Sequence, residues 1–168
     1  MRENWILAFG ALVLAVAGYL VLDKERIIQG GETVYLELAP VDPRSLMQGD
    51  YMALRFAAAR AASRRVEGSS MPRTGHLVLS VDDRGVARFQ ALDRGQELEP
   101  EEIRLRYHSR NGDPAIATNA YFFQEGTADS YEEAAFGVLR ITEDGRSVLV
   151  GLADENLEGL GPGNLQAF

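Results

Sequence analysis

The chain has no cysteine among its 168 residues, and it is poor in two other residues that carry common catalytic chemistry. The absence of cysteine excludes disulfide bonds, thiolate catalysis and cysteine-ligated metal sites. Lysine occurs once, as Lys24, and histidine twice, as His76 and His108. A serine–lysine hydrolase needs a lysine base inside its catalytic domain, and Lys24 instead stands directly after a long apolar run. The two histidines lack the spacing of a zinc site.

Signatures of nucleotide, calcium and serine-hydrolase sites are also absent. The glycine-rich stretch 159–163 is not flanked by a strand-turn-helix unit, so it does not indicate a phosphate-binding loop. The chain has no Asp-x-Asp-x-Asp-Gly loop and no Gly-x-Ser-x-Gly elbow. Its net charge of −8 disfavours binding to nucleic-acid phosphates. We therefore expect no cofactor, no metal ion and no nucleic-acid partner.

What the chain does have is one long uncharged apolar run, from Trp5 to Leu22. As a helix this run would reach about 27 Å, close to the thickness of the hydrocarbon core of a bilayer. Trp5 and Tyr19 suit the two interfaces of a bilayer, and Gly10 and Gly18 permit close packing against another helix. The run predicts a transmembrane signal anchor, with its flanks, over residues 1–26. A soluble, β-rich domain is expected over residues 27–168.

A cleaved signal peptide is the competing interpretation, because Ala15-Val16-Ala17 resembles a cleavage site. The apolar run continues through Leu22, where a mature N-terminus should become polar, and this favours an anchor that is not cleaved. The flanking charges, Arg2 before the run and Lys24 and Arg26 after it, give only a weak orientation signal. We expect a single-pass protein of the cytoplasmic (inner) membrane whose main domain is extracytoplasmic.

Short β-rich runs separated by turn residues fill most of the remaining sequence. The runs cover 33–39, 51–56, 76–81, 86–92, 103–108, 121–124, 136–142 and 147–152. The turns 82–85 and 143–146 predict two hairpins. The stretches 57–65 and 128–135 are expected to be short helices. A mainly β (α+β) fold follows, with about seven strands and two or three short helices in a compact twisted sheet or barrel-like domain.

A basic stretch interrupts this acidic domain. It contains Arg55, Arg60, Arg64, Arg65 and Arg73, opposed only by Glu67. A solvated helix or loop is the simpler interpretation. The more specific interpretation is that these arginines contact lipid headgroups or an acidic partner.

The segment 39–56 is the densest cluster of turn and polar residues. Asp42 before Pro43 can cap a helical turn, Gly49 can supply a positive φ, and Asp50 can accept hydrogen bonds from nearby backbone N–H groups. In the strand that follows, one face would carry Tyr51, Ala53 and Arg55 and the other Met52, Leu54 and Phe56. This local chemistry predicts a structural corner.

The string Gly49-Asp50-Tyr51-x-x-Leu54-x-Phe56 resembles the signature of the GDYXXLXY domain family. The stretches 40–44, 121–126 and 131–134 are also similar to the pattern of that family, and Phe56 replaces its final tyrosine. The resemblance implies a companion of a polytopic membrane protein rather than a particular reaction. The first hypothesis is therefore a membrane-anchored binding or assembly module, an accessory subunit whose partners are the lipid bilayer and a polytopic membrane protein.

The alternative is a membrane-anchored hydrolase or ligand-binding domain built on clustered carboxylates. Its candidates are Asp42, Asp50, Glu125 and Glu132, and turn capping with Arg44 as an ion-pair partner explains the same residues without a site. No catalytic residue is assigned. The candidate functional or structural corner comprises Asp42, Arg44, Gly49, Asp50, Tyr51, Glu125 and Glu132.

Overall fold

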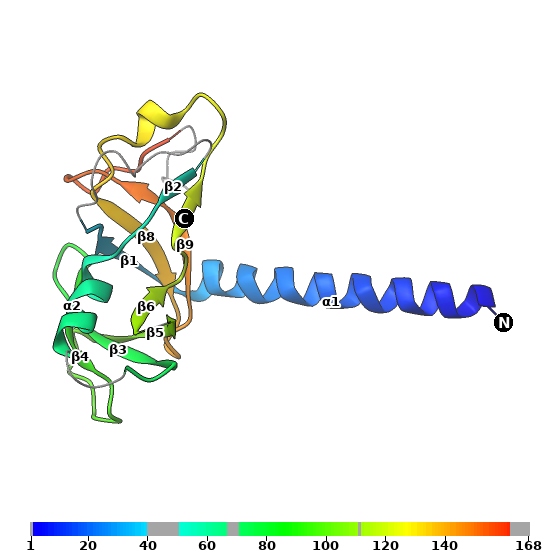
Figure 1. The fold of residues 1–168 in the computed structure, drawn as a ribbon, viewed down its shortest axis with the longest axis horizontal. Helices are drawn as coiled ribbons and strands as arrows, with labels where there is room; N and C mark the ends of the chain where they lie inside the picture. The colour runs from blue at the N-terminus through cyan, green and yellow to red at the C-terminus, as the bar shows by residue number, and fades with distance from the viewer. Residues whose placement is uncertain (1, 40–50, 67–70, 111, 162–168) are drawn as a thin grey trace.

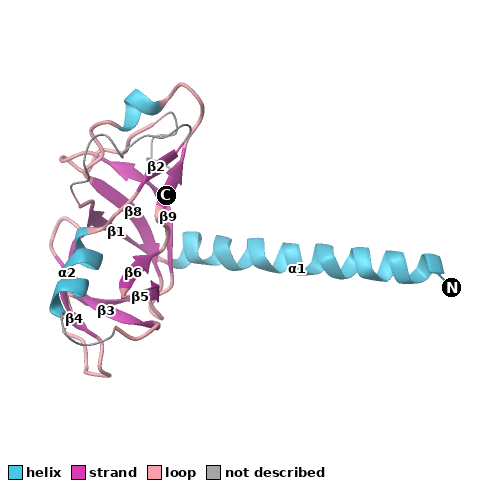
Figure 2. Cartoon of the chain, in the orientation of Figure 1, coloured by secondary structure: helices cyan, strands magenta, loops and turns pink. Residues whose placement is uncertain are grey.

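A computed structural model describes residues 2–39, 51–66, 71–110 and 112–161. A long N-terminal helix, α1 (Arg2–Gly30), projects away from a β domain and lies against that domain only at its C-terminal end (Figure 1). Strands dominate the rest of the chain (Figure 2). The fold is mainly β, as the sequence predicts.

Helix α1 occupies the apolar run and continues to Gly30. Each side chain that the structure describes between Phe9 and Leu22 is exposed, with Phe9 at 68% and Leu14 at 74%. Among the described residues, no helix combines the length and the hydropathy that crossing a membrane requires.

Seven strands form one sheet in the order β6-β5-β3-β4-β1-β8-β9. Their bounds are β1 (Glu32–Glu37), β3 (Thr74–Val81), β4 (Val86–Leu92), β5 (Glu102–Arg110), β6 (Asp113–Ile116), β8 (Phe136–Ile141) and β9 (Ser147–Ala153). Strands β1 and β4 are parallel, and the other neighbours in this sheet are antiparallel. A separate antiparallel pair joins β2 (Tyr51–Ala53) to β7 (Ala120–Phe122).

The large sheet curls until it almost closes on itself. The Arg106 N–H in β5 donates a 2.8 Å hydrogen bond to the carbonyl of Gly145, in the turn between β8 and β9. Gly145 has φ +79°, and a Cβ there would lie 2.9 Å from His76 Cδ2 and 3.0 Å from the Arg104 carbonyl oxygen. Only glycine combines this positive φ with the absence of a Cβ that would clash with His76 and Arg104. Register shifts at Val78/Leu79 and Val138/Leu139 assist the curl, because bulges increase the local twist.

The interior of this barrel-like sheet is apolar. Its central side chains, none more than 1% exposed, include Val34, Leu36, Leu77, Leu79, Leu105, Leu139 and Leu152. Helix α2 (Ala57–Arg65) packs against β4 and β6 through Ala58 and Ala62, whose small side chains allow a close approach. A 3-10 helix, η2 (Ala128–Tyr131), buries Tyr131 in the same core.

Most predicted elements are confirmed, including both hairpins and the helix at 57–65. Three expectations are wrong in detail. The runs expected as strands leave out β6, which contains Pro114 and lies at the edge of the sheet, where proline costs no ladder hydrogen bond. The strand at 51–56 ends at Ala53, apart from a single bridge between Leu38 and Phe56. The helix at 128–135 is a 3-10 turn that ends at Tyr131.

Candidate functional site

The junction between α1 and the β domain is held by Arg140 of β8. Its guanidinium donates hydrogen bonds to the carbonyls of Ile28 (2.7 Å) and Gln29 (3.3 Å) at the C-terminal end of α1. It also donates to Thr33 Oγ1 (2.6 Å) at the start of β1. A cation at this end of a helix satisfies carbonyls that have no partner within the helix and stabilises the helix dipole.

A second contact joins α1 to the β8–β9 turn. Arg146 bonds Asp23 Oδ1 of the helix and Asp144 Oδ2 of the turn, each at 2.7 Å. These carboxylates raise the pKa of Arg146, with the bond to Asp23 as the largest cause. The pKa of Asp144 is lowered, first by its hydrogen bond from the Thr142 hydroxyl and then by Arg146. Ile27 is buried beside these contacts, so the base of α1 is fixed to the hairpin.

The predicted corner lies largely outside the residues that the structure describes, because Asp42, Arg44, Gly49 and Asp50 fall in the segment 40–50. The described part confirms the predicted alternation. The buried side chains are Met52, Leu54 and Phe56; Tyr51 and Arg55 are exposed, and Ala53 is half-buried.

Tyr51 lies beside an aromatic cluster on β7 and η2. Its ring centroid is 5.8 Å from that of Phe122, its register partner on β7. On the inner side, Tyr131 packs edge-on against Tyr121 and stacks on Phe123, each at 5.3 Å. Burial and the hydrogen bond with Tyr131 raise the pKa of Tyr121 to about 12. The stretches 121–126 and 131–134 of the family pattern therefore meet in space and form a packed aromatic unit.

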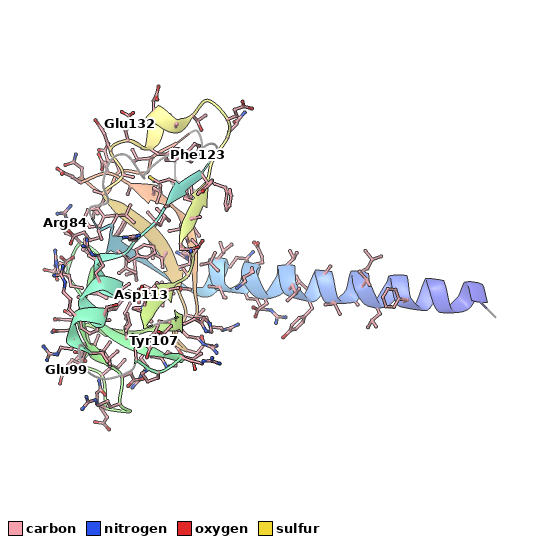
Figure 3. The ribbon with its side chains drawn as sticks, in the orientation of Figure 1. Arg84, Glu99, Tyr107, Asp113, Phe123 and Glu132 are labelled. Atoms are coloured by element: carbon pink, nitrogen blue, oxygen red, sulfur yellow. The ribbon has the colours of Figure 1, made fainter. Side chains whose placement is uncertain are left out.

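The carboxylates Glu125 and Glu132 are both exposed. Glu132 stands at the end of the domain that carries η2, away from Asp113 (Figure 3). Within the described ranges, no group of three or more His, Asp or Glu side chains could hold a metal ion. The distances from these two glutamates to Asp42 and Asp50 lie outside the described residues, so the carboxylate hypothesis stays a prediction.

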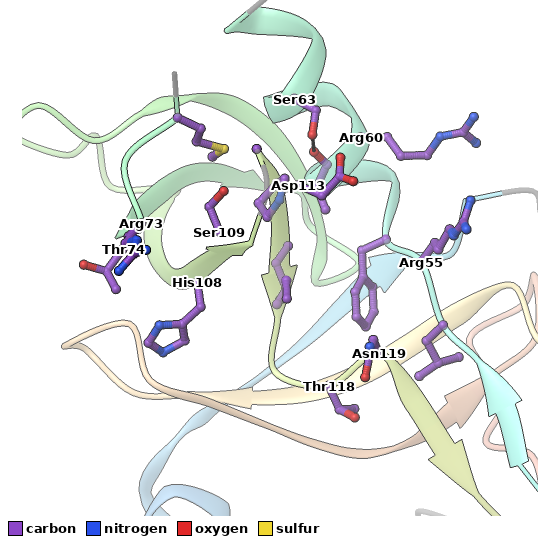
Figure 4. A pocket seen from close by; sticks show the side chains of 18 of the residues that line it. Arg55, Arg60, Ser63, Arg73, Thr74, His108, Ser109, Asp113, Thr118 and Asn119 are labelled. Atoms are coloured by element: carbon purple, nitrogen blue, oxygen red, sulfur yellow. Dashed lines mark hydrogen bonds between the residues drawn. The ribbon is translucent and has the colours of Figure 1, made fainter. Parts of the chain in front are cut away.

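The predicted basic stretch does form part of a site. A surface hollow of about 1410 Å³ is lined by Arg55, Arg60, Arg64 and Arg73, and we call it the arginine hollow. Arg55 and Arg60 stand on one side of it; Arg73, Thr74 and His108 stand on the other, with Ser109 and Asp113 between them (Figure 4). The floor includes the buried apolar side chains Leu54, Phe56, Met71 and Ile116. Among the described lining residues, Asp113 carries the single carboxylate.

Three arginines of this hollow differ from the ion-paired arginines elsewhere in the domain. Arg88, Arg104 and Arg146 each form an ion pair with an aspartate. Arg55, Arg64 and Arg73 are exposed and form no ion pair with any residue of the described ranges. Their positive charges are therefore not neutralised by neighbouring carboxylates of the described chain.

Sequence reasoning missed part of the hollow. His108, Ser109 and Asp113 come from β5 and β6, far from the basic stretch in sequence, and the missed strand β6 places Asp113 there. Arg65, which the sequence groups with the other arginines, does not line the hollow, since helical spacing turns it away from Arg64.

The GDYXXLXY family model, described as GDYXXLXY protein, matches residues 13–152. Neither a curated protein nor a solved structure matches the chain.

Proposed function

The chain belongs to the GDYXXLXY family, and from that premise we propose that it is a membrane-anchored binding module that accompanies a polytopic membrane protein. In this proposal α1 is the single transmembrane anchor, and the β domain lies on the extracytoplasmic side of the cytoplasmic membrane. The lipid bilayer and the polytopic protein are its partners.

One observation carries the proposal: the described part of α1 exposes apolar side chains around its whole circumference. Phe9, Leu12, Leu14, Val16 and Leu20 are all more than half exposed. A helix that serves a soluble core has one apolar stripe, whereas an apolar surface on every side suits lipid or another apolar helix. The apolar run that begins at Trp5 has the length of a bilayer crossing.

Small residues give α1 one face suited to a neighbouring helix. Ala11, Ala15 and Gly18 follow the helical spacing i, i+4 and i+7 and therefore share a face. A Cβ at Gly18 meets no atom within 4 Å, so the space beside it is open in this chain. Small residues on one face allow two transmembrane helices to approach closely.

The proposal is tested by purifying the full chain from membranes in a mild detergent. We expect the wild type to require detergent for extraction and to carry a polytopic protein with it. Ala15→Leu/Gly18→Leu should reduce the recovered partner at least fivefold, because the added side chains hold the two helices apart. Val13→Phe/Leu20→Phe adds bulk on the opposite face and should leave recovery unchanged.

Release of the chain by a wash without detergent would contradict the anchor. Equal loss of the partner in both double variants would contradict the packing face. A wild-type chain that is extracted by detergent but brings no other protein would contradict the accessory role.

The carboxylate alternative has its own test. Asp50→Asn should abolish folding if Asp50 belongs to a structural corner, and it should abolish only an activity if Asp50 acts chemically. Thermal unfolding of the purified variant separates the two interpretations.

A further inference from the structure

We propose that the arginine hollow binds an extended acidic peptide, contributed by the partner protein. The inference rests on the proposed function for the source of that peptide. The binding site itself rests on the lining of the hollow.

The first argument is charge. The protein carries a net charge of −8, yet the described lining of the hollow contains four arginines and one aspartate. Such a local reversal of sign attracts an anionic ligand against the field of the whole molecule. The absence of ion pairs for Arg55, Arg64 and Arg73 within the described residues leaves these guanidinium groups able to pair with carboxylates of a ligand.

The second argument is shape. Arg55 and Arg73 stand on different sides of the hollow (Figure 4). A volume of about 1410 Å³ also exceeds the roughly 300–1,000 Å³ of ordinary small-molecule pockets. An extended ligand with several negative charges fits this separation.

The third argument separates a peptide from an inorganic polyanion. The lining also includes the exposed Ala115 and the half-buried Ala53 and Ala59, whose methyl groups form no hydrogen bond with a chain of phosphates. The same apolar groups can contact the methylene groups of glutamate side chains. Polar side chains such as Ser109 and Asn119 can hydrogen-bond a peptide backbone.

The fourth argument excludes the headgroups of the bilayer that would hold α1. Helix α2, which carries Arg60 and Arg64, lies on the side of the β domain opposite to the point where α1 leaves it (Figure 1). The base of α1 is fixed by Arg140 and Arg146, so this orientation is maintained. The α2 side of the hollow therefore lies away from the bilayer in which we propose that α1 sits.

The test uses the full chain in an uncharged detergent and a fluorescein-labelled (Glu-Ala)5 peptide, followed by fluorescence anisotropy. We expect saturable binding that weakens at least tenfold in Arg55→Gln/Arg73→Gln. Arg65→Gln is the control for loss of charge outside the hollow: it removes one positive charge from α2 and should change binding less than twofold. A (Gln-Ala)5 peptide should not bind.

Several outcomes overturn the inference. The first is the absence of saturable peptide binding to the wild type. The second is unchanged peptide binding by Arg55→Gln/Arg73→Gln, when the thermal unfolding of that variant matches wild type. The third is a loss of peptide binding in Arg65→Gln as large as the loss in the double variant. Displacement of the peptide by inorganic polyphosphate at a much lower concentration would assign the hollow to a phosphate polymer instead.

Recovery of the partner separates this inference from the proposed function. If Arg55→Gln/Arg73→Gln loses the peptide and also recovers less partner, the acidic segment belongs to that partner. If it loses the peptide but recovers the partner in full, the assignment of the segment is wrong and the accessory role stands. A wild type that binds the peptide but recovers no partner contradicts the accessory role alone.

Discussion

The arginines at the base of α1 and those of the arginine hollow have the same side chain in two different settings. Arg140 and Arg146 are held by carbonyls, a hydroxyl and carboxylates of their own chain. Arg55, Arg64 and Arg73 form no ion pair with the described residues and stand around a hollow. The comparison teaches that the first group serves the stability of the fold, whereas the second is available to a ligand.

Replacing Arg140 should give the largest effect on stability. Arg140→Gln removes the donors to the carbonyls of Ile28 and Gln29 and to Thr33 Oγ1. We expect the free energy of unfolding of the β domain to fall by about 1–3 kcal/mol, the usual cost of leaving partly buried acceptors without a partner. Chemical denaturation of the full chain in detergent, monitored by far-UV circular dichroism, measures this free energy of unfolding.

The matched variant for Arg140 is Arg88→Gln, whose ion pair with Asp82 is exposed. Its effect should stay within about 0.5 kcal/mol, since exposed pairs contribute little. Equal losses in the two variants would show that Arg140 contributes no more than a surface charge.

A smaller effect is expected at Asp93, which pairs with Arg104 at 2.9 Å. The Gly95 N–H and then Arg104 hold the pKa of Asp93 below its ordinary value of 3.8. Because the pKa in the folded state is depressed, this stabilisation is present above about pH 3.8 and is lost as the pH falls through the folded pKa. Asp93→Asn should cost about 1 kcal/mol at pH 7 and make acid unfolding less steep.

Thermal unfolding between pH 2 and pH 7 checks this prediction. A variant whose unfolding temperature follows the same pH profile as the wild type would show that Asp93 does not contribute to acid sensitivity.

The smallest effect is expected in the hollow itself. Arg64→Gln should change the free energy of unfolding by less than about 0.5 kcal/mol, the usual range for exposed positions without a special contact. Arg65→Gln should behave alike, because both arginines stand in the last turn of α2. If Arg64→Gln lowered the free energy of unfolding by more than about 1 kcal/mol, the arginines of the hollow would have a structural role. They would then not differ in this respect from the arginines at the base of α1.

Local sequence signals predict much of this fold. The alternation of Met52, Leu54 and Phe56 with exposed residues gives the correct buried face, and Gly85 and Gly145 mark both hairpin turns with positive φ. Strand β6 escapes prediction because Pro114 is typical of a turn and becomes a strand residue only beside β5. The parallel pairing of β1 with β4 joins segments far apart in sequence, and no local pattern encodes it.

The arginine hollow likewise has one part that the sequence predicts and another that depends on long-range strand pairing. The charge of the basic stretch is visible in the sequence and identifies three of the four lining arginines as neighbours on or near one helix. Its union with His108 and Asp113 depends on the order β6-β5-β3, which comes from long-range pairing. The contacts of Arg140 and Arg146 with α1 join residues more than 100 positions apart, so they too require the folded chain.

The β8–β9 hairpin touches α1 at its base and β5 at Gly145, and this gives the molecule a mechanical property. A sideways pull on the helix reaches the hairpin through Arg140 and Arg146 and passes along it to the closure of the sheet. Among the described residues, that closure rests on the hydrogen bond from Arg106 to Gly145, so we expect it to open before the seven-stranded sheet comes apart. Tension applied to the N-terminus would thus unzip the domain from its closure point, and α2 with its arginines would be disturbed late.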